Sequence, residues 1–440
     1  MKTAKFFELA KLHGLESCEV VISKDTSIDM NVYQAEVENY SIADSRVIYA
    51  RGILNGKMGF AVSEKDDAKT PEYLVKQIII SASNSESDDV AIIFKGSEKY
   101  KKRNMFNKKI TALSEEAKLQ NLFIIEKKLK AYDSRISDVD AASYSESESQ
   151  LELYNSFGLK LKESDNHFYY YASVVIKEGE EVKTGYKVAL FNDPDALDID
   201  LFVKQVAEDG LSKLGGKPCK SGKYPTLINP KVTSSLLAAY LGSANAERVQ
   251  KKSSLFIDKL GTKVASSKIT VLDAPLTKNI FYTYFDGEGV AKFNKPVIEK
   301  GVLKTFFHNL STAAKAGVST TANGSNSGGK IGISISNIVL KPGRKSSEEL
   351  MKDIKEGFYL TEVQGLHSGL NPTSGDFSLQ ASGFMIRDGK FAEPVNLVTI
   401  AGNLQKLFLD VKAVANENEL QLSSYTTSSI LVKKLAVSGE

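Results

Sequence analysis

The chain has 440 residues, of which 42% are apolar and 25% charged, and its formal net charge is +3. This is the composition of a globular protein long enough for two or three domains, and the near-neutral charge gives no electrostatic basis for direct binding of nucleic acid. The two cysteines, Cys18 and Cys219, lie far apart, and the chain has neither an apolar leader nor an apolar run of membrane-spanning length. These features predict a cytoplasmic protein without a membrane segment.

Residues 1–98 are predicted to form an N-terminal α+β domain. Apolar residues at helical spacing predict a helix over 3–13 that ends at Gly14, and Thr70-Pro71-Glu72 has the N-cap, proline and early acid of a second helix start. Between the two helices, apolar and polar residues alternate, and Asn55-Gly56 is a hairpin signal. The alternation predicts an antiparallel sheet with strands in 18–23, 27–43 and 46–62.

A basic run at 99–109 (KYKKRNMFNKK) is predicted to be a linker, because a solvated linker is favoured over a phosphate contact when the net charge is so small. Residues 110–217 then repeat the order helix, strands, helix as a central α+β domain. Ser114 caps the first helix, which extends to about Tyr132. The strands are expected at 139–154, 159–162, 168–176 and 185–191, and the closing helix at 198–214.

Residues 218–440 are predicted to form a C-terminal strand-rich domain covered by helices. It begins with a short strand at 224–230 and a helix of small residues at 233–242, TSSLLAAYLG. Its densest stretch, 365–404, places glycines, the extended dipeptide Asn371-Pro372 and the hairpin turn Asp388-Gly389 among short apolar strands. This pattern predicts a closely folded loop that leads into a hairpin.

No metal site is predicted from the acidic, histidine and cysteine residues. The histidines are scattered, and no His-Glu-x-x-His or close His/Cys pair places two ligands on one helical face. Structural roles are favoured for His13, His167 and His308, whereas His367, inside the glycine-rich stretch, keeps a functional interpretation. Asp286 and Glu288 in DGEG offer oxygen ligands, but a solvated turn is favoured in the absence of further spaced acids.

The sequence supports neither a phosphate-binding loop nor a nucleophilic active site. The run from Gly324 to Lys330 (GSNSGGK) has the spacing of a phosphate-binding loop, but Ile331 replaces the hydroxyl that would hold magnesium and the following residues alternate as a strand. No serine stands in Gly-x-Ser-x-Gly, and neither cysteine has a histidine near it in sequence. The residues by themselves therefore indicate no catalytic group.

The glycine-rich stretch is the candidate binding segment, although a tight structural loop is favoured over a binding loop. A carboxylate beside a glycine in a tight turn is placed to hold backbone N–H groups, either of its own loop or of a strand-like guest. The candidate substrate-binding residues are His367, Asn371, Gly375 and Asp376.

Several motifs together resemble the TldD/PmbA family, and specifically its PmbA (TldE) branch. They are SGDFSLQASGFMIRDGK followed by PVNLVTIAGNL, with DGEGV, VIEKGVLKTFFHN and RGILNGKMGFAVS. The resemblance spans nearly the whole chain. It implies an α+β fold with antiparallel and mixed sheets, covering helices and a β-barrel-like element in the C-terminal part. It also implies membership of a two-subunit cytosolic metallopeptidase that trims unfolded peptides and matures a peptide antibiotic, in a family that older naming calls a modulator of DNA gyrase.

In a TldD-type subunit, a His-Glu-x-x-x-His helix follows the strand that reads YPTLINP here, and it supplies zinc ligands and the general base. Here that helix reads TSSLLAAYLG, with neither His nor Glu, so the resemblance transfers no catalytic residue. It implies a subunit that itself carries no zinc and pairs with a TldD-type subunit, or with a second copy of itself, around an unfolded peptide. A self-sufficient hydrolase using His367, Asn371 and Asp376 is one alternative. A non-proteolytic adaptor that binds peptides or associates with gyrase is another.

Overall fold

The computed structural model describes residues 2–327 and 330–440, and the chain divides into two compact units. Unit 1 comprises Met1–Ser212, Lys278–Lys292 and Asn309–Gly332, and unit 2 comprises Lys213–Thr277, Phe293–His308 and Ile333–Glu440. Two segments that lie late in the sequence therefore belong to the unit built by the N-terminal half.

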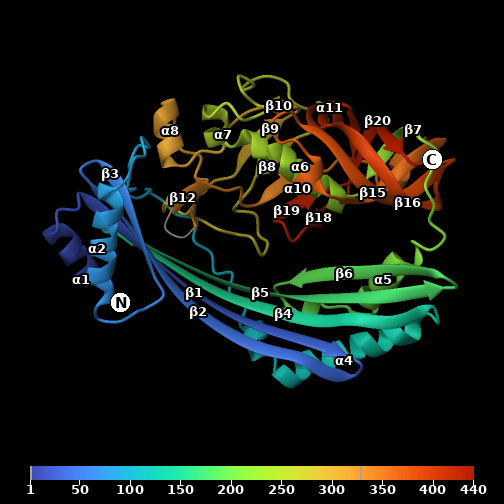
Figure 1. Ribbon diagram of the computed structural model, residues 1–440, viewed down its shortest axis with the longest axis horizontal. Helices are drawn as coiled ribbons and strands as arrows, with labels where there is room; N and C mark the ends of the chain where they lie inside the picture. Colours follow the sequence, from blue (N-terminus) through green and yellow to red (C-terminus); the bar gives the residue numbers. More distant parts are fainter. Residues whose placement is uncertain (1, 328–329) are drawn as a thin grey trace. The chain divides into compact units, whose positions relative to one another are not determined.

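Unit 1 is built on a six-stranded antiparallel sheet with strand order β3-β2-β1-β4-β5-β6. Its long central strands run side by side in Figure 1, and α4 lies along one face of them. The sheet strands are β1 (Ser17–Tyr33), β2 (Glu36–Leu54), β3 (Lys57–Ser63), β4 (Ile136–Asn155), β5 (Lys160–Glu178) and β6 (Glu181–Phe191). The remaining elements are α1 (Thr3–Leu12), α2 (Thr70–Ser83), α3 (Lys108–Ala112), α4 (Glu115–Tyr132), η1 (Pro194–Ala196), α5 (Ile199–Leu211), α8 (Leu310–Ala316) and the two-stranded sheet of β11 (Gly324–Ser327) and β12 (Lys330–Ile333).

The helix starts of unit 1 follow the expected local chemistry. Ser114 accepts a hydrogen bond from the backbone N–H of Ala117 at the start of α4, and Pro71 lies in the first turn of α2. Phe6 of α1 and Leu74 and Ile78 of α2 pack in one cluster with β-sheet residues such as Val20. The apolar stripes predicted from spacing thus form the helix-covered face of the sheet.

The strand boundaries of unit 1 differ from the sequence pattern in two places. The predicted strand 27–43 contains a hairpin turn at Gln34 and Ala35, both with positive φ, and the predicted strands 159–162 and 168–176 are one continuous strand, β5. Neither turn residue is Gly or Asn, so the local sequence gave no turn signal. The pairing of β1 with both β2 and β4 along most of its length imposes this geometry.

Unit 2 contains a closed barrel and a second, mixed sheet. The barrel order is β16-β15-β14-β7-β20, closed by pairing of β16 with β20, and β17 extends it beside β20. The second sheet has the order β10-β9-β8-β13-β19-β18, in which β13 and β19 are parallel. This confirms the α+β fold with antiparallel and mixed sheets and a C-terminal five-stranded barrel.

The strands of unit 2 are β7 (Gly222–Ile228), β8 (Val271–Asp273), β9 (Lys295–Glu299), β10 (Val302–Leu303), β13 (Ile338–Leu340), β14 (Glu356–Gln364), β15 (Asp376–Arg387), β16 (Lys390–Asn403), β17 (Val411–Val414), β18 (Glu419–Leu420), β19 (Tyr425–Thr427) and β20 (Ile430–Ser438). Its helices are α6 (Pro230–Leu241), η2 (Gly242–Ala244), α7 (Ala246–Gln250), α9 (Ser347–Met351), α10 (Leu366–Gly369) and α11 (Leu404–Leu409). The helix expected at 233–242 is thus α6, which begins three residues earlier.

Candidate functional site

Helix α6 follows strand β7, at the place where the resemblance puts a zinc-binding helix. Its first turn is fixed by Asn229, whose side chain accepts a hydrogen bond from the N–H of Val232 at 2.8 Å, and by Pro230 at the first helical position. The Asn229 side chain also donates to the carbonyl of Thr361 on β14 at 3.0 Å. The start of α6 is therefore tied to two neighbouring barrel strands.

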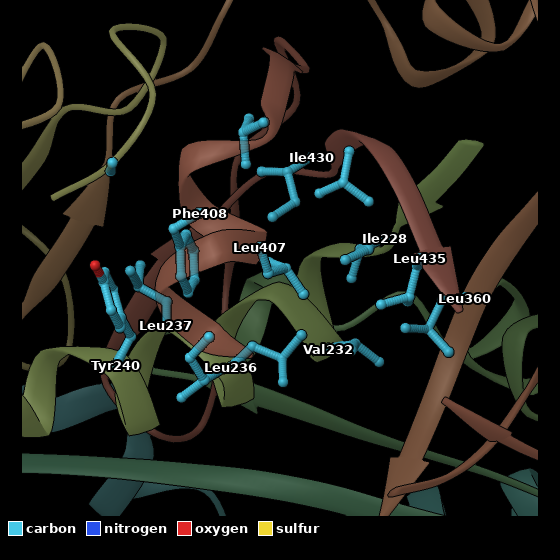
Figure 2. Packing of buried hydrophobic residues seen from close by; sticks show 14 of the residues in the cluster. Ile228, Val232, Leu236, Leu237, Tyr240, Leu360, Leu407, Phe408, Ile430 and Leu435 are labelled. Atoms are coloured by element: carbon cyan, nitrogen blue, oxygen red, sulfur yellow. The ribbon is translucent and has the colours of Figure 1, made fainter. Parts of the chain in front are cut away.

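The side chains of α6 fill the core of unit 2. Figure 2 shows Val232, Leu236, Leu237 and Tyr240 packed among residues of α11 and of the barrel strands. Leu236, Leu237 and Tyr240 are fully buried. The Tyr240 ring stacks on Phe408 with centroids 4.7 Å apart, and its hydroxyl donates to the carbonyl of Val264 at 2.6 Å.

This packing does not fit a zinc ion. Zinc requires nitrogen, sulfur or carboxylate ligands, whereas the buried positions of α6 carry aliphatic groups, one tyrosine whose hydroxyl is already used, and two hydroxyl residues. The Thr233 hydroxyl donates to the carbonyl of Ile228, and the Ser234 hydroxyl is hydrogen-bonded to that of Ser423. Burial raises the pKa of Tyr240, which opposes formation of a phenolate ligand. Across residues 2–327 and 330–440, no three His, Cys, Asp or Glu side chains are grouped so that they could hold a metal ion.

The glycine-rich loop between α10 and β15 is a tight, internally bonded turn. The Asn371 side chain accepts hydrogen bonds from the N–H groups of Thr373 and Ser374 at 2.9 and 3.1 Å, and the Asn371 carbonyl accepts one from Gly375 N–H at 2.8 Å. Gly375 has a φ of +80°, and a Cβ there would lie 3.0 Å from Leu255. Only glycine fits this position without strain.

The carboxylate of Asp376 holds the other end of the same turn. Its two oxygens accept hydrogen bonds from the Ser374 hydroxyl at 2.8 Å and from the Asn403 amide at 2.9 Å, and these bonds lower the pKa of Asp376, with the Asn403 bond as the larger cause. The Asp376 carboxylate therefore binds side-chain donors. The backbone N–H groups that it was expected to bind are bound instead by the Asn371 side chain. Asn403 also caps α11, so the turn is joined to the end of β16.

Three of the four candidate residues come together in this turn. Asn371, Gly375 and Asp376 are linked by backbone bonds, including the N–H of Asn371 to the carbonyl of Asp376 at 2.9 Å. His367 lies on the preceding helical turn, α10. The side chains of His367, Asn371 and Asp376 are exposed, while Gly375 is buried. The turn thus presents an exposed carboxylate and an exposed amide, and the imidazole of His367 lies outside it on α10.

The expectation of a solvated turn at DGEG was wrong. Asp286 and Glu288 are 2% and 3% exposed, and they lie in unit 1 beside an ion pair between Glu19 and Arg51. Arg51 Nε donates to Glu19 at 2.9 Å, and Arg51 Nη1 lies 3.5 Å from Glu288. Glu19 and Arg51 are opposite each other in the register of β1 and β2, so an acid within the apolar run 18–22 and a base within the largely apolar run 47–54 were the available clue.

Backbone donors complete this buried acidic group. Asp286 accepts N–H bonds from Glu288, Val290 and Gly324, and Glu288 accepts one from Leu310 at 2.8 Å. Burial raises the pKa of Asp286 and of Glu19. Burial is also the largest cause for Glu288, whose pKa rises to about 7 although Arg51 opposes the change. The group anchors both late segments of the chain on the N-terminal sheet.

The run GSNSGGK falls partly outside the described residues, because 328 and 329 are not among them. Its described parts belong to the strands β11 and β12, which form a two-stranded sheet. Gly324 packs directly on the acidic group, where a Cβ would lie 2.6 Å from a Glu288 oxygen. The glycine therefore permits close approach to these carboxylates.

Family models match most of the chain. Residues 108–214 match the PmbA/TldA metallopeptidase central domain, and residues 221–439 match the PmbA/TldA metallopeptidase C-terminal domain. A curated relative, the metalloprotease PmbA homolog of Haemophilus influenzae, is 25% identical over 448 residues, covering 98% of this chain and 94% of that protein.

None of the helices in the described ranges has the length and apolar character needed to cross a bilayer.

Solved structures agree with these matches. A Thermotoga maritima protein named as a modulator of a DNA gyrase has a TM-score of 0.91 and 28% identity, covering 99% of both chains. TldE from Thermococcus kodakarensis has a TM-score of 0.91 at 22% identity, covering 99% of this chain and 100% of that one, a likeness that concerns the fold. The barrel, the sheets and the matched domains together show that this chain belongs to the PmbA/TldD metallopeptidase family.

Proposed function

We propose that this chain is the PmbA/TldE-type subunit of a cytosolic two-subunit metallopeptidase that cleaves unfolded peptides or matures peptides. A TldD-type subunit would bring the zinc ion and the general base, and this chain would help to enclose the substrate. The observation that carries the proposal is helix α6, which places Leu236, Leu237 and Tyr240 in the core at the position expected for zinc ligands.

Zinc catalysis needs more than a single replaced side chain. A catalytic zinc site has three protein ligands, an open position for water and supporting hydrogen bonds to the ligands. A histidine introduced at Leu236 or Tyr240 would lie among fully buried apolar groups and would leave a cavity or an unpaired nitrogen. Restoring His and Glu in α6 is therefore not expected to create a peptidase.

The role proposed for the glycine-rich turn is contact with the peptide. An extended peptide offers backbone N–H and carbonyl groups, and the exposed Asp376 carboxylate and Asn371 amide are groups that bind them. Their positions are fixed by Gly375 and Asn403, so little conformational entropy is lost on binding. His367 is the third candidate contact, on the neighbouring turn of α10.

The test is hydrolysis of an unfolded peptide by this chain, by a TldD-type subunit, and by the two mixed. We expect chelator-sensitive cleavage by the mixture, lost when the partner's His-Glu-x-x-x-His motif is changed and absent with this chain alone. Robust cleavage by this chain alone would favour the self-sufficient hydrolase. A mixture that neither associates nor cleaves would favour the non-proteolytic adaptor.

A second arm tests the turn. Asp376→Ala should raise KM for the peptide in the mixture, because it removes an exposed acceptor and the bond that positions Asn403. Glu299→Ala is the matched control, since Glu299 is also an exposed acid of unit 2, on β9. Equal KM values for the two variants would remove Asp376 from the proposed binding surface.

A further inference from the structure

The outer edge of strand β2 is unpaired over most of its length. β2 pairs with β1 along its whole length, but β3 covers only Ile48–Leu54 on the other side. Over residues 36–47, the described strands leave the outer side of β2 without a partner. Residues 36–45 are all exposed, so the edge is also open to solvent.

This edge has only part of the protection that keeps strands apart. Free edges are normally shortened, bulged or protected by proline or by charged side chains, lysine above all, and here the only such protection is a set of acids and one arginine, Glu36, Glu38, Asp44 and Arg46. The segment EVENYSIADSRV contains neither lysine nor proline, and the one irregularity in its pairing with β1 lies beside the hairpin turn, at Asn31/Val32. It also exposes three large apolar side chains, Val37, Tyr40 and Ile42, at 45%, 41% and 53%.

We infer that this edge of β2 pairs antiparallel with the same edge of a second copy of this chain, joining the two sheets across a two-fold axis at Ile42. The second copy is favoured because the segment is complementary to itself in charge. Antiparallel pairing about Ile42 places Glu38 opposite Arg46 of the other copy, twice, and leaves no like charges directly opposite. The inference goes beyond the proposed function and does not depend on peptidase activity.

Neighbouring registers are less favourable. An axis at Ser41 would pair Glu36 with Arg46 but would oppose Glu38 to Asp44, and an axis at Ala43 would pair no opposite charges. An axis at Tyr40 would oppose Glu36 to Asp44. With the axis at Ile42, the pairs across the interface are Val37 with Val47, Glu38 with Arg46, Asn39 with Ser45, Tyr40 with Asp44, Ser41 with Ala43, and Ile42 with itself.

The side chains on this edge are compatible with a neighbouring strand. On one face, Asn39, Ser41 and Ala43 are small and uncharged, so a second strand meets no bulky or charged obstruction. On the other face, Arg46 contacts Asp66 through Nη2, and its planar guanidinium has further N–H donors that can bind Glu38 of the second copy. Pairing would cover Val37 and Ile42, which are exposed in the single chain.

Cysteine cross-linking tests the register. The native thiols, Cys18 and Cys219, are buried, so introduced surface thiols can be read separately. Ile42→Cys should form a covalent dimer on mild oxidation, because the two copies of residue 42 are directly opposite and within disulfide reach. Asn39→Cys and Ser45→Cys should each remain uncrosslinked alone, since like residues are then about 20 Å apart, but should cross-link when the two variants are mixed.

Dimerisation in solution supplies the second arm. Ile42→Lys should weaken the dimer by about tenfold or more in sedimentation or size-exclusion titrations, because two like charges then face each other across the axis. Leu201→Lys is the control, since Leu201 on α5 is 51% exposed and lies away from the edge. Both variants should keep the native far-UV circular dichroism.

Three results would overturn the inference. The first is an Ile42→Lys variant as dimeric as the control. The second is the absence of cross-linking both at residue 42 and between residues 39 and 45. The third is association of this edge only with an added TldD-type subunit, which would show that the occupant is not a second copy.

Discussion

The buried carboxylate of Glu288 makes the stability of unit 1 depend on pH in a direction that one variant can test. Its pKa is about 7 in the folded protein, against an ordinary value of 4.5. A raised folded-state pKa means that the contribution to stability is fully present below pH 4.5 and is lost as the pH rises through about 7. At about 1.4 kcal/mol per pH unit, the loss is about 3 kcal/mol.

The variant is Glu288→Gln, which resembles the protonated acid and cannot ionise. Glu288 faces the Arg51 guanidinium on β2, the Glu19 carboxylate on β1 and the Asp286 carboxylate in its own loop, and it accepts the N–H of Leu310. Between pH 4.5 and 8 the native protein should lose about 3 kcal/mol of stability through Glu288, and the variant should not. The free energy of unfolding of the variant, minus that of the native protein, should therefore increase by about 3 kcal/mol over this range. This change does not depend on the intrinsic effect of the amide.

Urea unfolding at four or five pH values, followed by far-UV circular dichroism because the chain has no tryptophan, measures this difference. Glu163 and Asp165, whose pKa values burial raises to about 7 and about 6, are expected to titrate alike in both proteins and cancel. Glu19 and Asp286 lose a like charge beside them in the variant, so their ionisation becomes easier and adds to the difference in the same direction. Glu8→Gln is the control, since Glu8 is exposed on α1. Parallel pH profiles for Glu288→Gln and the native protein would refute the reasoning.

Five further predictions concern the other sites. Tyr240→Phe should lower the free energy of unfolding by about 1–2 kcal/mol, because the buried Val264 carbonyl loses its donor. Leu236→Ala should lower it by about 2–5 kcal/mol, because it leaves a cavity in the core, and urea titration measures both changes. Gly375→Ala should cost about 1–2 kcal/mol through its positive φ and the contact with Leu255, and a retained urea midpoint would contradict this. Elemental analysis of the purified chain should find no stoichiometric zinc, and close to one zinc per chain would contradict this expectation. The chain should bind DNA only weakly and in a salt-sensitive way, and sequence-specific binding at physiological salt would contradict that.

Local sequence determined the features that depend on neighbouring residues. Ser114 capped its helix, Asn55-Gly56 formed the turn between β2 and β3, and Gly14 follows α1 with a φ of +81°. Capping, turn type and apolar spacing act over a few residues, so their outcome could be predicted before any tertiary contact was known. The motifs of the C-terminal half likewise placed the chain in its family.

Only the tertiary structure decided what happens where distant segments meet. The hairpin turn at Gln34 and Ala35 is imposed by strand register, and the acids of DGEG are buried because residues 278–292 and 309–332 pack with the N-terminal sheet against Arg51. The sequence could not show this, because an isolated DGEG segment is polar and would be solvated. A buried charge is stable only beside a partner, here an arginine more than 200 positions away in the chain.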